Sequence, residues 1–122
     1  VNQIELHPWF QQPDVVAANE RHGIVTQCWS PLARGDNFDE PVLADIARTH
    51  DADVGAVILA WELARGFSTI PKAGSERHRR GNLAALDIRL AADEIAAIDA
   101  LDRSEAGRTG ESPYVNSDGS PR

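Results

Sequence analysis

Short apolar runs alternate with longer segments of helical periodicity along most of this chain. Residues 1–6, 24–29 and 67–71 are short apolar runs with Pro or Gly nearby, a pattern typical of strands. Apolar positions spaced by three and four residues predict helices over residues 13–22, 40–49, 54–65, 75–85 and 92–101. From residue 102 the chain is polar and rich in Gly, Ser and Pro, which indicates an irregular tail.

Residues that favour helix ends mark where these helices begin and stop. Pro13 stands in the first turn of the first helix, and Gly23 follows its end. Asp39 is a candidate N-cap for the second helix, Gly66 ends the third, and Ser75 is the expected N-cap of the fourth. Periodicity and capping chemistry therefore indicate the same helices.

The predicted order is strand, helix, strand, two helices, strand, two helices and a tail. Strands that alternate with helices imply right-handed crossovers and a parallel sheet. Three such strands cannot close a barrel, and a (β/α)₈ barrel typically needs about 250 residues. This α/β chain of 122 residues would therefore supply less than half of a barrel.

Composition fits a globular protein and argues against several classes of partner. Hydrophobic residues make up 42% and charged residues 25%, and no apolar run approaches the length of a membrane span. A net charge of −7 argues against nucleic acid or anionic membranes as partners, so an anionic ligand is expected to be small and bound locally. The single cysteine, Cys28, excludes an internal disulfide and predicts a reducing, cytoplasmic location. The His residues show no metal-ligand spacing, so no metal site is predicted.

The start of the chain and its lack of Met favour a fragment of a longer protein. No Met occurs at any position, and the sequence opens directly on strand-like residues. Removal of an initiator Met would explain the first feature alone, but both features together predict a fragment.

Lys72, the only lysine, stands where the third apolar run ends. Residues 72–80 hold four of the twelve Lys and Arg residues, although the whole chain is acidic. A strand that ends in a cation and leads into a helix N-terminus favours anion binding, because the helix dipole and free N–H groups both attract negative charge. The alternative is a solvated basic helix face, which the charge run alone does not exclude.

Three sequence blocks occur in register along the chain. They are VNQIELHP at residues 1–8, WSPLARG at 29–35, and IPK at 70–72 with Asn82 ten residues beyond. In order and spacing these blocks resemble the C-terminal part of the aldo-keto reductases, most closely the bacterial 2,5-diketo-gluconate reductase-like branch. DEIAAIDALD at 93–102 and GRTG at 107–110 are similar to the same branch.

The resemblance implies a (β/α)₈ TIM barrel that binds NADPH in an extended form across the C-terminal ends of its strands. Residues 1–103 would be the C-terminal part of that barrel, with strands six to eight and their helices, and residues 104–122 the loop that closes over the substrate. The implied activity is reduction of aldehydes or ketones to alcohols, with a small carbonyl substrate and a monomeric parent protein. Phosphate often binds after strands seven and eight of such barrels, which agrees with the predicted anion site.

Carried over position by position, the resemblance implies eight cofactor-binding residues: Gln3, Trp29, Ser30, Leu32, Arg34, Lys72, His78 and Asn82. Gln3 matches the residue that binds the nicotinamide carboxamide, and the alternative is an ordinary polar strand residue. Trp29 matches the aromatic residue on which the nicotinamide ring stacks, and the alternative is core packing.

The other matches concern the phosphates and the adenine. Ser30, Leu32 and Arg34 match the loop that covers the pyrophosphate, although Arg34 departs from the small or amide residues common there and could instead lie in solvent. Lys72 matches the cation that reaches the adenosine 2′-phosphate. Asn82 matches the residue that binds the adenine edge, with a helix-surface Asn as the alternative.

Two positions depart from the family's pattern and bear on the choice of dinucleotide. Ala73 stands where Ser or Thr usually binds the 2′-phosphate, and His78 stands where Arg usually clamps phosphate and stacks on adenine. A His side chain offers no bidentate fork to phosphate, although Arg77 or Arg79 would compensate in part if the helix were rotated. The expectation is a weakened preference for NADPH, so that NADH is also accepted.

The chemistry in this family is performed by a Tyr proton donor, a Lys and an Asp that tune it, and a His that orients the carbonyl. All four lie in the N-terminal half of the barrel, and none has a counterpart in this chain. Tyr114, the only Tyr, lies in the tail, and His7 is not the catalytic His. The chain alone is therefore expected to be inactive. Two alternatives remain: a dinucleotide-binding regulatory module that has lost catalysis, and a natural half barrel that pairs with itself or with another half.

Overall fold

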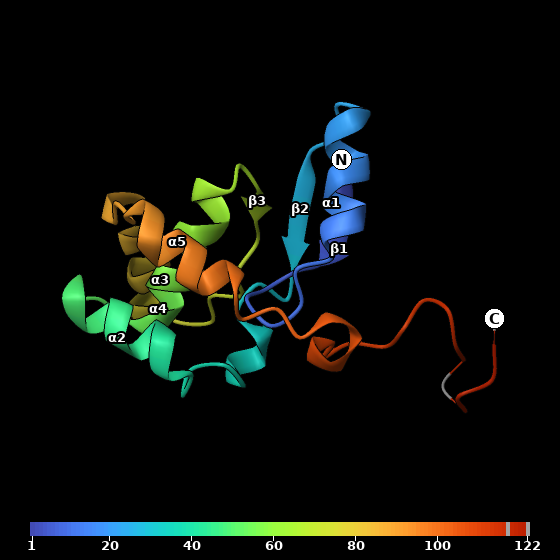
Figure 1. The fold of residues 1–122 in the computed structure, drawn as a ribbon. Coiled ribbons are helices and arrows are strands. Elements are labelled where there is room, and N and C mark those ends of the chain that lie inside the picture. The colour runs from blue at the N-terminus through green and yellow to red at the C-terminus, as the bar shows by residue number, and fades with distance from the viewer. Residues whose placement is uncertain (117, 122) are drawn as a thin grey trace.

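A three-stranded sheet organises the structure, a computed structural model that describes residues 1–116 and 118–121. Its strands are β1 (Asn2–Glu5), β2 (Thr26–Trp29) and β3 (Ser68–Thr69), in the order β1-β2-β3 (Figure 1). Both pairs are parallel, with Ile4 opposite Cys28 and Cys28 opposite Thr69. The predicted α/β class and the parallel pairing of the strands are therefore confirmed.

The second and third strands are shorter than their apolar runs predict. Ile24 and Val25 precede β2 and are exposed, and β3 pairs with β2 at two positions only. A third strand at the edge of a sheet is held by one neighbour, and Pro71 has no N–H to donate to a ladder. The chain therefore leaves the sheet before Ile70.

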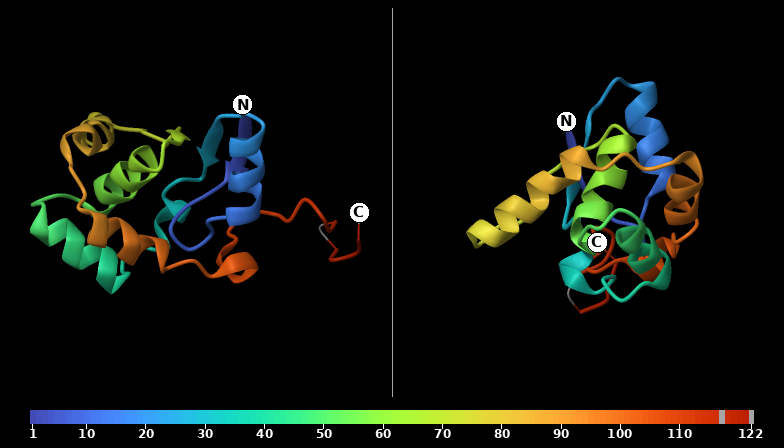
Figure 2. Two further views of the ribbon diagram at one scale, coloured as in Figure 1. Left: turned by 45° about the horizontal axis from the view of Figure 1, so that its top comes forward. Right: turned by 90° about the vertical axis from the view of Figure 1, so that its left-hand side faces the viewer.

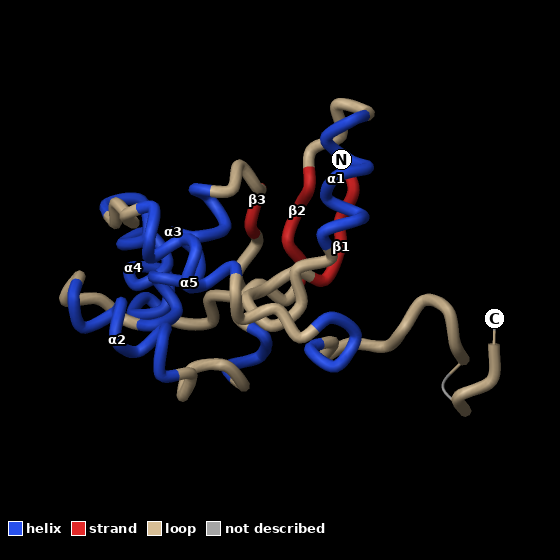
Figure 3. Tube along the Cα trace, viewed as in Figure 1, coloured by secondary structure: helices blue, strands red, loops and turns tan. Residues whose placement is uncertain are grey.

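The described residues form five α-helices and three short 3₁₀ helices, which Figure 3 shows in blue. The α-helices are α1 (Pro13–Arg21), α2 (Pro41–Thr49), α3 (Val54–Ala64), α4 (Glu76–Ala84) and α5 (Ala92–Asp99). The 3₁₀ helices are η1 (Ala33–Gly35), η2 (Ala85–Asp87) and η3 (Ser104–Gly107). Each predicted helix is present within about two residues of its expected bounds.

The N-caps of α4 and α2 were both predicted from the sequence, with different outcomes. Ser75 caps α4 as predicted, and its Oγ accepts a hydrogen bond from the His78 N–H at 3.2 Å. The prediction of Asp39 as the cap of α2 was wrong, because Glu40 occupies that position and Pro41 is the first helical residue. A proline suits the first turn and keeps the preceding residue extended, so α2 starts later than its periodicity indicated.

The core lies between the sheet and its helices, with α3 at its centre. Residues 56–62 of α3 are all buried. The apolar cluster draws on the ends of β1 and β3, on β2 and on four helices: Leu6, Val16, Cys28, Leu43, Ile46, Ala47, Val57, Ile58, Trp61, Phe67 and Ile98. In contrast, α4 has no buried residue. The polar side chains of α4 are therefore available at the surface.

The opposite face of the sheet is polar and largely uncovered by the described residues. Gln3 lies opposite Gln27, and the Gln27 Nε2 donates to the Ser68 Oγ at 3.3 Å. Trp29, two positions further along β2, is on the same face and is 39% exposed. The described residues thus cover mainly one face of this parallel sheet.

The C-terminal segment first docks against the end of β1 and then leaves the body of the molecule. Residues 104–110 lie beside the β1 and β2 ends, whereas the described residues beyond them extend away, as the left view in Figure 2 shows. Among the described residues, no helix is long and apolar enough to cross a membrane.

Candidate functional site

The loop that follows β2 has an unusual backbone. Ser30, Ala33 and Arg34 have positive φ values of 52°, 45° and 56°, and Gly35 follows at 89°. Positive φ is uncommon for residues other than glycine and costs on the order of 1 kcal/mol each. Such backbone is found where a loop must take one particular shape, often around a ligand.

This loop and the residues after β3 form the two sides of a cleft at the carboxyl edge of the sheet. Ligands of parallel α/β sheets commonly bind at this edge. The cleft has a volume of about 1170 Å³, above the roughly 300–1,000 Å³ of ordinary small-molecule pockets. An extended ligand would therefore have room in it.

Seven of the eight predicted site residues line this cleft: Trp29, Ser30, Leu32, Arg34, Lys72, His78 and Asn82. They come from the end of β2, from the loop that follows it, from the end of the third apolar run and from α4. The eighth residue, Gln3, does not line the cleft. It lies on the exposed sheet face, where it is paired with Gln27. Glu5, two residues further along the same strand, is paired with Trp29.

The basic cluster at residues 72–80 divides between the cleft and the surface. Lys72 and Arg77 line the cleft together with Arg34 from the facing loop, and Asp53 is the one acidic residue of its lining. Arg80 is turned outward and forms an ion pair with Glu76 at 2.6 Å. The solvated helix face was the alternative to an anion site, and it describes Arg80, whereas Lys72 and Arg77 are positioned where an anion could meet them.

The start of α4 adds to the positive character of the cleft. The helix has nine residues, and its capped N-terminus follows directly on the segment that carries Lys72. Backbone N–H groups and the helix dipole favour an anion at such an end. An otherwise acidic chain therefore gathers positive charge at this side of the cleft.

Trp29 connects the cleft with the C-terminal segment. Its indole lines the cleft, and one edge of the ring packs against Gly110. A β-carbon at position 110 would come within 2.7 Å of the ring. No side chain fits between Gly110 and the indole, so the backbone of the segment lies directly on the ring.

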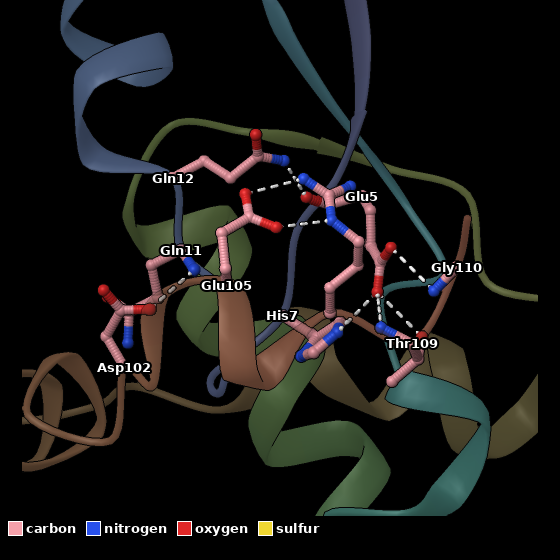
Figure 4. Close-up of polar contacts among 9 residues, drawn as sticks. Glu5, His7, Gln11, Gln12, Asp102, Glu105, Thr109 and Gly110 are labelled. Atoms are coloured by element: carbon pink, nitrogen blue, oxygen red, sulfur yellow. Dashed lines mark hydrogen bonds and ion pairs between the residues drawn. The ribbon is translucent and has the colours of Figure 1, made fainter. Parts of the chain in front are cut away.

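Glu5 holds that segment in place through a buried carboxylate (Figure 4). Its Oε1 accepts hydrogen bonds from the Thr109 N–H at 2.6 Å, the Thr109 hydroxyl at 2.7 Å and the His7 Nε2 at 3.1 Å. Its Oε2 accepts from the Gly110 N–H at 2.9 Å. Burial by itself raises the pKa of Glu5, but these hydrogen bonds together outweigh it and hold the pKa below its ordinary value.

His7 completes this cluster as a neutral donor. It is fully buried, and burial lowers its pKa against the smaller upward effect of Glu5. The Nε2–H then donates to Glu5, while Nδ1 has no partner among the described residues. The cluster thus holds one negative charge with its hydrogen-bond donors around it.

Sequence reasoning assigned no role to Glu5, Thr109 or Gly110, and it also missed Phe38, which lines the cleft. One local signal was present, because Glu5 is a charged residue at the end of an apolar run. Its partners lie 104 and 105 positions away, so no local pattern could identify them. Among the described residues, no group of three or more His, Cys, Asp or Glu could hold a metal ion.

Comparison with known proteins agrees with the family that the sequence blocks resemble. A sequence model described as the aldo/keto reductase family matches residues 1–103. The uncharacterized oxidoreductase YtbE of Bacillus subtilis is 40% identical over 104 residues, which are 85% of this chain and 37% of YtbE. The 2,5-diketo-D-gluconic acid reductase B of a Corynebacterium species is 38% identical over 104 residues, 84% of this chain and 38% of that protein.

The fold comparison agrees with the sequence comparison. A crystal structure of a mutant of Gox0644 in complex with NADPH superimposes with a TM-score of 0.87 at 37% identity, covering 92% of this chain and 41% of that one. The chain thus spans about two fifths of the length of the proteins it matches. The predicted family and its 2,5-diketo-gluconate reductase-like branch are confirmed, and the chain belongs to the aldo/keto reductase family.

Proposed function

We propose that the protein to which this chain belongs reduces aldehydes or ketones with a reduced nicotinamide dinucleotide, and that this chain supplies the dinucleotide site. In this proposal the three strands are strands six to eight of a (β/α)₈ barrel. The main support is that seven of the eight residues predicted to contact the cofactor line one cleft of about 1170 Å³.

The cleft offers chemistry that suits each part of a dinucleotide. Trp29 presents an indole to which a flat nicotinamide ring can stack, a contact worth roughly 1 kcal/mol. Ser30, Leu32 and Arg34 lie on the strained loop and would cover the pyrophosphate. Lys72 would pair with the 2′-phosphate of NADPH.

Asn82 and Gln3 would bind the two ends of the dinucleotide, the adenine and the nicotinamide. Asn82 lines the cleft on α4 and would bind the adenine edge. Gln3 lies on the polar face of the sheet, outside the lining, so its proposed contact with the nicotinamide carboxamide requires the ring to extend over that face. The uncovered face would receive the remaining strands of the barrel.

When bound, the cofactor would supply the hydride for carbonyl reduction. The residues of this chain would bind and orient it: the Trp29 indole excludes water from one face of the ring, and the cations hold the phosphates. The proton donor and its partners would come from the N-terminal half of the barrel, so the chain alone is expected to be inactive. Small dicarbonyl compounds and sugar-derived ketones are the proposed substrates, in line with the name of the Corynebacterium relative.

The decisive test is dinucleotide binding by the full-length protein, measured by calorimetric titration with NADPH and NADH. Lys72→Met should weaken NADPH binding by roughly 10- to 100-fold, the loss of one charge-assisted contact. NADH binding should stay unchanged, because NADH has no 2′-phosphate. Arg80→Met is the matched control, since Arg80 belongs to the same basic run but pairs with Glu76 at the surface.

Each outcome bears on a separate part of the proposal. A wild-type protein that binds neither dinucleotide would overturn the proposed function. Equal losses for NADPH and NADH with Lys72→Met would contradict only the role of Lys72. Binding of NADPH without turnover of glyoxal or 2,5-diketo-D-gluconic acid would favour the regulatory module over the enzyme.

A further inference from the structure

The buried Glu5 carboxylate accepts four hydrogen bonds. Three of its four bonds come from Thr109 and Gly110, and they fix two successive peptide groups of the C-terminal segment on one buried carboxylate. Hydrogen bonds to an ionised group are stronger and more directional than neutral ones. The segment is therefore held in one position at the end of β1.

That position places Gly110 against the ring of Trp29. Position 110 has no room for a β-carbon, which would lie 2.7 and 2.8 Å from two atoms of the indole and 2.9 Å from the Glu5 Oε2. Glu5 and Trp29 are also paired in the register of β1 and β2. Carboxylate, glycine and indole thus form one contiguous unit in which each part limits the movement of the next.

A second anchor keeps the segment from sliding along the strand ends. Gly107 packs so closely on the Trp9 carbonyl that a β-carbon there would overlap it, and the Arg103 N–H donates to the same carbonyl at 2.8 Å. The Arg108 guanidinium lies over the Phe10 ring, 4.4 Å from its centre. The segment is therefore positioned from both ends, with the Glu5 contact nearest to the cleft.

We propose that Glu5 is a positioning residue for cofactor binding: it holds residues 109–110 against Trp29 and thereby fixes the orientation of the indole in the cleft. This inference rests on the proposed function, because it concerns the ring to which the nicotinamide would stack. Glu5 itself does not line the cleft and acts through Gly110 and Trp29. The same contact couples the C-terminal segment to occupancy of the dinucleotide site.

The main test is Glu5→Gln in the full-length protein. A glutamine keeps the shape of the side chain, but its Nε2 faces an N–H donor and at least one backbone group of the segment loses its acceptor. NADPH binding should weaken about tenfold, as expected for loss of a hydrogen bond to a charged group. Energy transfer from tryptophan to the nicotinamide at saturating NADPH should also fall, because the indole is no longer held.

Gly110→Ala tests the contact between the C-terminal segment and the Trp29 indole. The two Thr109 donors to Glu5 are unchanged, but the new methyl group would press on the indole and on the Glu5 Oε2 and so displace the ring. Its expected effect is the same loss of binding and of energy transfer as in Glu5→Gln. A segment that only stabilised the fold would leave the saturated energy-transfer signal of both variants at the wild-type level.

Conservative variants supply the control and the rescue. Glu20→Gln makes the same chemical change at an exposed carboxylate of α1 and should bind NADPH as the wild type does. Thr109→Val removes one hydroxyl bond to Glu5 and should weaken binding about threefold, whereas Thr109→Ser should restore it. This pair decides the matter if Glu5→Gln does not fold.

The outcomes separate this inference from the proposed function. A wild-type protein that binds NADPH, together with Glu5→Gln, Gly110→Ala and Thr109→Val variants that bind it equally well and with the same signal, would overturn the positioning role and leave the proposed function standing. A wild-type protein that binds no dinucleotide would overturn both.

Discussion

The Asn19 side-chain amide lies 2.9 Å from the Thr26 hydroxyl, and this buried pair joins α1 to β2. Asn19 also accepts a hydrogen bond from the Asn2 Nδ2 at 3.1 Å, which extends the link to β1. Figure 1 shows α1 lying along these two strands. The Asn19 amide therefore links the first helix to both of the strands that carry Glu5 and Trp29.

Replacing this amide should destabilise the fold. Asn19→Ala leaves the buried Thr26 hydroxyl without its donor, so the free energy of unfolding should fall by about 1–3 kcal/mol. Urea denaturation followed by circular dichroism measures the change. Asn116→Ala, at an exposed Asn that bonds to Ser120 in the tail, should have little effect. Similar losses for the two variants would argue against a special role for Asn19.

Glu62 should make stability fall as the pH rises. It is fully buried in α3, and burial raises its pKa well above the ordinary value, with a smaller opposing effect from Thr69. The folded protein therefore keeps a proton that the unfolded chain releases near its ordinary pKa of 4.5. The contribution of Glu62 is fully present below that pKa and is lost, by at most about 1.4 kcal/mol per pH unit, as the pH rises through the folded pKa.

Glu62→Gln is the matched variant, because it is neutral at every pH and similar in shape. The difference in unfolding free energy between wild type and variant should shift in favour of the variant as the pH rises from 4 to about 8. Denaturant midpoints at a series of pH values measure this shift. A difference independent of pH would mean that Glu62 is not buried as a neutral acid.

Local signals in the sequence predicted the helices well, since periodicity and caps such as Ser75 act within a few residues. The strand ends were less predictable. The length of β3 is limited because the strand pairs with β2 only and because Pro71 has no N–H to donate. The same contrast holds at the site. Lys72 was recognised from its place at a strand end, whereas the role of Glu5 depends on residues more than a hundred positions away, which only the folded chain brings near.

Docking of the C-terminal segment should weaken in acid. The pKa of Glu5 is lowered despite its burial, because hydrogen bonds from Thr109, Gly110 and His7 favour the carboxylate. A lowered pKa stabilises the docked state above the unfolded pKa, and that stabilisation is lost as the pH falls through the folded pKa. Protection of the Thr109 and Gly110 amides against hydrogen exchange should therefore decrease below about pH 4.5.

The backbone N–H of Ile24 provides an internal control, because it bonds to the Asn19 carbonyl and not to a carboxylate. Its protection factor should change less than those of Thr109 and Gly110 over the same range. In the Glu5→Gln variant, the acid-dependent loss at positions 109 and 110 should disappear. Persistence of that loss in the variant would show that another titrating group controls the docking.

The full-length protein should discriminate only weakly between NADPH and NADH. In the proposed site Lys72 would offer a charge to the 2′-phosphate, but Ala73 has no hydroxyl and His78, which lines the cleft, has no guanidinium fork. Missing one hydroxyl and one charge-assisted contact should reduce discrimination by about 2–4 kcal/mol. The ratio of kcat/KM for NADPH over NADH should therefore lie below about a thousandfold.

Restoring the missing groups should restore the preference. Ala73→Ser and His78→Arg together should raise the kcat/KM ratio by about tenfold or more, through better use of NADPH and with little change for NADH. Arg77 lines the cleft beside His78, so it is expected to compensate in part, and Arg77→Met should lower the wild-type ratio. A wild-type ratio above a thousandfold would refute the weakened preference, and an unchanged ratio in Arg77→Met would remove Arg77 from the phosphate site.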